Sequence, residues 1–220
     1  MVRPTVITIM RELGSGGSYV ALQAARQLGY AYIDQQILRE AAKELGCHEA
    51  ELENRDGRLQ SFWEKLIDVF AMGAPEGIYT PPPHWISDER LIETENRLMR
   101  ELASKGPCVV VGRGAFYILR GEEKLFNVFI HAPLSFRIRR VMGMYGAANE
   151  KEAAGMIDRS DQERNRHIRF STGLNRLDVR NYHLSIDTGM IDFASAAEMI
   201  VNSARKATEE GDWPWVRDPA

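Results

Sequence analysis

The fold is decided by residues 5–18, TVITIMRELGSGGS. The β-branched run 5–9, which follows a proline and precedes a glycine cluster, predicts a short strand. Apolar residues at helical spacing over 18–28, ending just before Gly29, predict a helix. A glycine-rich turn between a strand and a helix brings backbone N–H groups and a helix N-terminus to one point. The turn is therefore a candidate anion site.

This turn departs from the phosphate-loop pattern G-x-x-x-x-G-K-[ST] at two positions. Arg11 stands at the first glycine and Gly17 at the lysine, whereas Gly16 and Ser18 match. We expect the loop to bind the phosphates of a nucleotide and Ser18 to supply a hydroxyl ligand to Mg²⁺. The alternative is a tight turn in which Ser18 caps the helix. The predicted nucleotide-binding residues are Gly14, Ser15, Gly16, Gly17 and Ser18.

Strands and helices alternate along the rest of the chain. Short apolar runs predict four more strands, and helical periodicity predicts the segments between them. The expected strands are 31–33, 108–111, 126–130 and 182–186, and the expected helices are 36–45, 59–72, 88–104, 150–170, 192–209 and one that begins at 134. This order predicts a three-layer α/β fold with a five-stranded parallel sheet, which binds ligands at the carboxyl ends of its strands.

The composition excludes several classes of protein. The chain has 220 residues, of which 44% are hydrophobic, so it can bury a core of its own. Its formal net charge of −3 argues against nucleic acid as the main partner. No apolar run reaches the roughly 18 residues of a membrane span, and the two cysteines lack a C-x-x-C spacing. We therefore expect a cytoplasmic protein without a disulfide framework and without a membrane partner.

Arginine is concentrated in one segment of this acidic chain. Residues 134–180 carry 10 basic side chains, nine of them arginine, and 6 acidic ones, for a net charge of 10 − 6 = +4. Arginine is suited to planar, bidentate contacts with oxyanions, so the segment is a candidate phosphate-binding region. The alternative is a solvated helical face that carries pairs such as Arg159 with Glu163.

Several motifs, in this order, resemble the cytidylate kinase-like family, a branch of the P-loop nucleoside monophosphate kinases whose loop has the form R-x-x-G-S-G-G. The motifs are residues 7–18, 28–34, 110–114, 131–140, 159–166 and 182–188. The resemblance implies a P-loop NTPase-type fold that uses ATP and Mg²⁺. It also implies a kinase core at 1–37 and 106–210, a lid at about 142–175, a helical acceptor-binding insert at 38–105 and a tail at 211–220.

The resemblance also suggests roles for individual residues. Those expected to bind the acceptor are Asp34, Arg39, Arg113, Arg140 and Glu163, and those expected to act in catalysis are Arg137, Arg159 and Arg166. Asp34 has a helix N-cap as its alternative role. Arg11 is the cation nearest in sequence to the absent lysine, and we expect it to take part in catalysis; its alternative is an ion pair with Glu12 or Asp34.

These features predict ATP-dependent phosphoryl transfer to a nucleoside monophosphate-like acceptor. The expected partners are a nucleotide and a small-molecule acceptor, and the expected assembly is a monomer or a homodimer. One alternative is a nucleotide-binding or sensing protein that lost catalysis together with the loop lysine. Another is an interaction protein that uses its arginine-rich helix on RNA, which the overall acidity disfavours.

Overall fold

A parallel five-stranded sheet forms the centre of the chain in a computed structural model, which describes residues 6–34, 89–112, 114–120 and 125–209. Its strand order is β2-β3-β1-β4-β5, so β1 lies in the middle. The strands are β1 (Val6–Arg11), β2 (Ala31–Ile33), β3 (Cys108–Val111), β4 (Leu125–His131) and β5 (Leu184–Asp187). The predicted five-stranded parallel sheet is confirmed.

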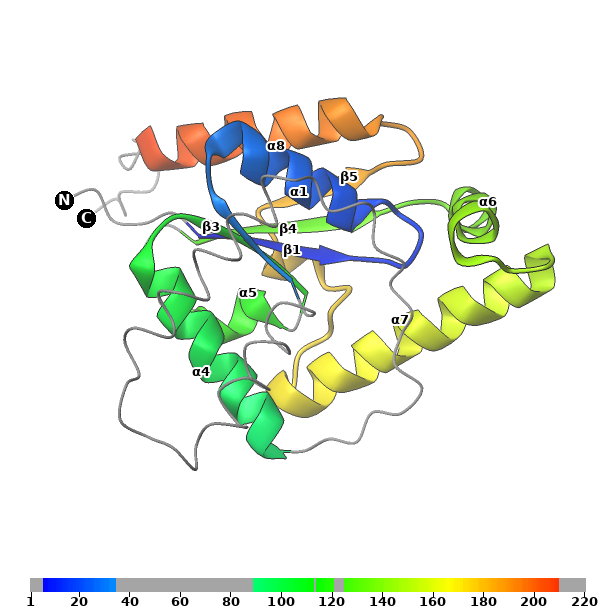
Figure 1. Ribbon diagram of the computed structural model, residues 1–220, viewed down its shortest axis with the longest axis horizontal. Coiled ribbons are helices and arrows are strands. Elements are labelled where there is room, and N and C mark those ends of the chain that lie inside the picture. Colours follow the sequence, from blue (N-terminus) through cyan, green and yellow to red (C-terminus); the bar gives the residue numbers. More distant parts are fainter. Residues whose placement is uncertain (1–5, 35–88, 113, 121–124, 210–220) are drawn as a thin grey trace, which may run out of the picture.

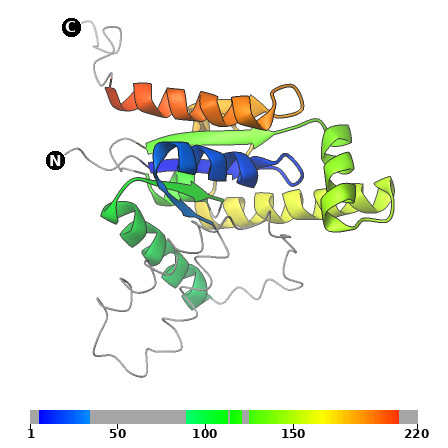
Figure 2. The ribbon, with the colours of Figure 1, turned by 45° about the horizontal axis from the view of Figure 1, so that its top comes forward.

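Helices cover both faces of the sheet and complete the predicted three layers (Figure 1). One face is covered by α1 (Gly17–Leu28) and α8 (Phe193–Glu209). The other face carries α4 (Glu89–Lys105), the short α5 (Ala115–Ile118) and α7 (Glu150–Thr172). Helix α6 (Leu134–Tyr145) stands across one end of the sheet (Figure 2). Within the described ranges, no helix combines the length and the apolar character that crossing a bilayer requires.

The central strand β1 is buried along its whole length, including the polar Thr8 and Arg11. Because side chains alternate across a strand, Ile7 and Ile9 pack toward α1 and α8, whereas Val6 and Met10 pack on the opposite face. The facing sides of α1 and α8 are rich in buried alanine, which lets the two helices approach the sheet closely.

Strands β1, β4 and β5 have boundaries that differ from the sequence prediction, and β4 is one residue longer at each end. Strand β1 continues to Arg11 because that residue still pairs with Ile130 of β4, which carries Arg11 to the carboxyl edge of the sheet. Strand β5 begins at Leu184 because residues 179–181 form a 3-10 turn, whose start is capped by the Asp178 carboxylate. The predicted helices 36–45 and 59–72 lie outside the described residues.

A histidine side chain takes part in the pairing of β4 with the start of β5. The Asn127 N–H donates to His183 Nδ1 (2.8 Å), and the His183 N–H donates to the Asn127 carbonyl (2.8 Å). Nδ1 can accept only while the ring is neutral. Partial burial lowers the pKa of His183 below its ordinary value of 6.5, which agrees with this role.

This contact predicts a pH dependence of stability. Below pH 6.5 His183 takes up a proton in the unfolded chain more readily than in the folded protein. Its contribution to the free energy of unfolding is therefore complete above pH 6.5 and is lost as the pH falls below that value. The loss should stay under about 1 kcal/mol because the ring is exposed on one side. Urea unfolding between pH 7.5 and 5.5 should show a steeper decline for the parent than for His183→Gln. Parallel pH profiles would contradict this role of His183.

Candidate functional site

The glycine loop, residues 12–16, connects β1 to α1 at the carboxyl edge of the sheet. Gly14 and Gly16 have φ angles of +81° and +76°, in the left-handed region that favours glycine. Within the described part of the chain, the N–H groups of Gly14, Gly16, Gly17 and Ser18 have no hydrogen-bond partner. These donors surround the N-terminus of α1, where a helix offers its N–H groups and its positive dipole end to an anion. This geometry agrees with the predicted phosphate site.

Neighbouring helices pack directly against the loop and leave no room for side chains at its glycines. A Cβ on Gly14 would lie 2.9 Å from the carbonyl oxygen of Arg137 in α6. A Cβ on Gly16 would lie 2.6 Å from the ring of Phe193 in α8. The loop is therefore enclosed by the first turns of two helices as well as by its own strand.

Hydroxyl groups fix the backbone of the same loop. Ser15 is fully buried, and its hydroxyl donates to the carbonyl of Glu12 (2.9 Å). The hydroxyl of Thr188, which follows β5, lies 2.7 Å from the Ser15 carbonyl. The side chain of Ser15, predicted to bind nucleotide, therefore supports the loop, and only its backbone can face a ligand. Helix α1 has Gly16 at its N-cap position, so the alternative role of Ser18 as the cap is wrong.

Tyr32 lies close to two predicted site residues. Its hydroxyl is near Ser18, in the first turn of α1, and near Asp34, which follows β2. Burial, and secondly the charge of Asp34, raise the pKa of Tyr32 well above its usual value. The structure thus brings together the predicted metal ligand and a predicted acceptor residue. Sequence reasoning missed Tyr32, although a tyrosine in a buried strand needs a partner for its hydroxyl.

Asp161, in the middle of α7, collects donors from three other segments. Its Oδ2 accepts from Arg137 Nη1 (2.5 Å), and its Oδ1 accepts from the Leu13 N–H (3.3 Å). Arg164 on the same helix (3.4 Å) and Arg176 (3.7 Å) complete the ion pairs. The side chain of Asp161 is only 15% exposed. One carboxylate therefore ties α6, α7 and the segment after α7 to the glycine loop.

Arg176 is the most deeply buried of these cations, with 2% of its surface exposed. Its Nε donates to Asn165 (2.7 Å) and its Nη1 to the carbonyl of Arg11 (3.1 Å). Burial lowers the pKa of Arg176, while the charge of Asp161 acts in the opposite direction. Sequence reasoning missed Arg176 because the loop that carries it has no motif. It also missed that Asp161 and Arg164 take part in these ion pairs.

Arginines outnumber carboxylates around the glycine loop in the described part of the chain. Arg11, Arg137, Arg164 and Arg176 lie there, and the ion pairs that the described residues form with this group come from Glu12 and Asp161. Arg137 Nε is buried without a hydrogen-bond partner among the described residues and lies 3.5 Å from Glu12. Buried excess cationic charge is costly unless an anion compensates for it.

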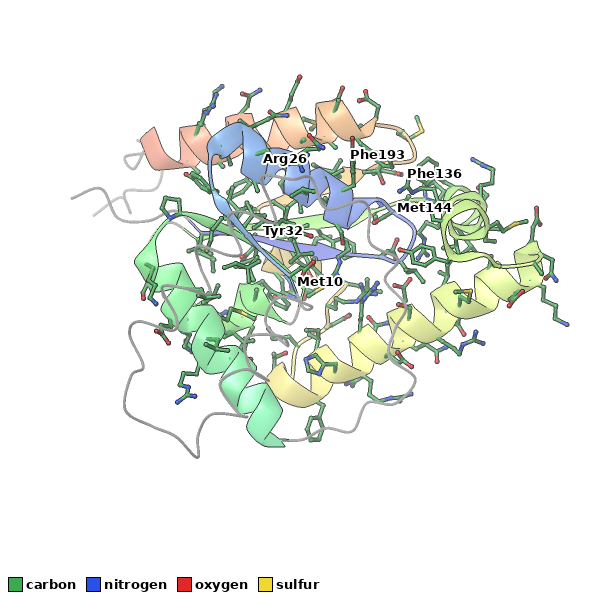
Figure 3. The ribbon with its side chains drawn as sticks, in the orientation of Figure 1. Met10, Arg26, Tyr32, Phe136, Met144 and Phe193 are labelled. Carbon is green, nitrogen blue, oxygen red and sulfur yellow. The ribbon has the colours of Figure 1, made fainter. Side chains whose placement is uncertain are left out.

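The remaining predicted residues have different environments. Arg140 lies with its guanidinium 4.6 Å from the ring centre of Phe193, on the α8 side of the loop. Figure 3 shows Phe193 close to Phe136, with which it makes an edge-to-face contact. Arg159 and Arg166 are exposed on α7, and Glu163 is half-buried. Arg39 and Arg113 lie outside the described residues. The roles of these residues stay predictions.

Comparisons with known proteins agree with this architecture. The cytidylate kinase from Aeropyrum pernix is 26% identical over 194 residues, which cover 88% of this chain and 95% of that one. A structure of an uncharacterized protein from Eubacterium ventriosum superposes with a TM-score of 0.68 at 23% identity, over 91% of this chain and 98% of that one.

A shikimate kinase from Bacteroides thetaiotaomicron shares the fold at a TM-score of 0.50 and 14% identity, over 91% of this chain and 98% of the other. The family profile described as "Cytidylate kinase-like family" matches residues 6–190, most of the chain. The resemblance inferred from the motifs is confirmed: the chain belongs to the cytidylate kinase-like family.

Proposed function

We propose that this protein is an ATP-dependent kinase of a nucleoside monophosphate-like acceptor. The observation that carries the proposal is a glycine loop whose N–H groups lack partners among the described residues and beside which Arg137 and Arg176 are buried. Phosphoryl transfer requires little covalent chemistry from a protein, but it requires charge neutralisation and positioning. Family membership and the cytidylate kinase relative support a nucleotide kinase-like function.

The residues of the loop fit the phosphates of ATP. The N–H groups of Gly14, Gly16 and Gly17 would donate to phosphate oxygens, and Ser18 would be one of the few protein ligands of the accompanying Mg²⁺. ATP, when bound, supplies the phosphoryl group. The buried arginines around Asp161 would hold positive charge next to the phosphates and keep water away from them.

The second candidate is a nucleotide-binding or sensing protein of the same fold. The specific observation in its favour is Gly17, which stands where the phosphate-loop pattern has lysine. The two candidates share ATP binding and differ only in turnover.

An assay of ADP formation separates them. The protein is incubated with ATP–Mg²⁺ and, one at a time, CMP, dCMP, UMP, AMP, GMP and simple alcohols; ATP binding is measured by calorimetry. We expect ADP formation well above the acceptor-free background with a pyrimidine monophosphate. ATP binding without phosphorylation of any acceptor would favour the sensor. Absence of ATP binding would contradict both candidates.

A further inference from the structure

Two departures from the phosphate-loop pattern in this chain are neighbours in space. The pattern has glycine at the position of Arg11 and lysine at the position of Gly17. In the structure, a Cβ placed on Gly17 would lie 2.5 Å from Cβ and 3.1 Å from Cγ of Arg11. Two such carbons cannot approach to 2.5 Å without a shift of the backbone. In this geometry only one of the two positions can carry a long side chain.

The side chain of Arg11 crosses the first residue of α1 and ends at the carboxyl end of β3. Its Nη1 occupies the space where a Cβ of Gly112 would stand, and Gly112 has a φ of +81°. The Gly112 N–H donates to the Ile9 carbonyl (2.9 Å), which holds the two strand ends together. Glycine at 17 and at 112 therefore forms the space through which the arginine passes.

The Arg11 side chain is largely buried, and its guanidinium is unpaired among the described residues. Arg11 is 9% exposed, and within the described ranges its guanidinium has no hydrogen-bond or ion-pair partner. Neither Glu12 nor Asp34 forms the alternative ion pair with it in that part of the chain: Glu12 pairs with Arg137. A cation that is largely removed from water and has no counter-charge is stabilised when an anion reaches it.

We propose that Arg11 supplies the cation that lysine supplies in the standard loop, and that Gly17 is glycine because Arg11 occupies its space. The inference rests on the proposed function, in which this loop binds a nucleoside triphosphate. Arg11 contacts the terminal phosphates from the end of β1 rather than from helix α1. Its planar fork gives two parallel hydrogen bonds, which hold a phosphate in a fixed orientation.

Exchanging the two residues tests the proposal. Arg11→Gly, Gly17→Lys and the double variant are compared with the parent by calorimetry with inorganic tripolyphosphate and with ATP–Mg²⁺. Arg26→Ala, which removes an exposed arginine near the other end of α1 (Figure 3), is the matched control. Melting temperatures show which variants fold.

Arg11→Gly should weaken tripolyphosphate binding by roughly 10- to 100-fold, as for a lost charge-assisted contact. The double variant, which has the standard pattern, should recover most of that affinity, whereas Arg26→Ala should bind like the parent. Gly17→Lys alone should melt at a lower temperature than the double variant, because both side chains then compete for one space.

Three results would overturn the proposal: no binding of tripolyphosphate by the parent, unchanged binding by Arg11→Gly, or a folded double variant that binds no better than Arg11→Gly. If the double variant does not fold, Arg11→Lys and Arg11→Met decide instead, since only the lysine keeps a cation. Equal affinity of these two variants would contradict the proposal. Tripolyphosphate binding tests Arg11 separately from the kinase activity because tripolyphosphate contains no nucleoside. If its binding depends on Arg11 but the protein phosphorylates no acceptor, the proposed function is refuted and the role of Arg11 stands.

Discussion

Replacing Asp161 with asparagine is expected to lower the free energy of unfolding by about 3 kcal/mol. The carboxylate accepts from Arg137 (2.5 Å) and from the Leu13 N–H (3.3 Å), and it pairs with Arg164 and Arg176. Breaking a buried ion pair by removing one partner leaves an uncompensated buried charge, which is strongly destabilising. Chemical denaturation at neutral pH measures the difference.

The same helix provides a control for this substitution. Asp158 lies one turn earlier, is exposed and, among the described residues, accepts hydrogen bonds from Gln162 alone. Asp158→Asn should change the free energy of unfolding by less than about 0.5 kcal/mol. If both substitutions had equally small effects, the arginines would be solvated and Asp161 would not organise the cluster. Because ATP would bring negative charge to this cluster, saturating ATP–Mg²⁺ should restore part of the stability that Asp161→Asn loses.

The order and type of the elements could be predicted because each strand is a short apolar run with a clear break on either side. Strand boundaries were less predictable, since they depend on partners elsewhere in the chain. Pairing with Ile130 extends β1 to Arg11, and the side chain of His183 takes part in pairing before β5 begins. Neither partner can be identified from local sequence.

The glycine loop could be found from sequence because glycine marks a backbone requirement, but the ion pairs around it could not. On α7 the prediction selected Arg159, Glu163 and Arg166, a face whose two arginines are exposed. The face turned to the loop carries Asp161 and Arg164. This face of α7 lies between the buried Ile157 and Ile168, which are eleven residues apart. Apolar residues at that spacing mark the buried face of a helix, and this was the sequence signal that could have identified it.

The enclosure of the glycine loop predicts a second large effect, at Gly16. Gly16→Ala should lower the free energy of unfolding by roughly 2 to 5 kcal/mol. One part of the cost is the φ of +76°, which L side chains rarely adopt; the other is a Cβ 2.6 Å from the ring of Phe193. Either response, a shifted loop or a displaced ring, changes the arrangement of the N–H groups. Affinity for ATP–Mg²⁺ should therefore fall as well.

Gly146 separates these two costs. It has nearly the same φ, +72°, but a Cβ there would meet nothing within 4 Å, so Gly146→Ala should cost only the backbone strain of about 1 to 2 kcal/mol. The rest of the loss in free energy of unfolding at Gly16 comes from the collision of the new Cβ with Phe193. A double-mutant cycle with Phe193→Leu measures that part. In that background Gly16→Ala should be milder by about 1 kcal/mol. Equal costs for Gly16→Ala and Gly146→Ala would show that α8 does not constrain the loop.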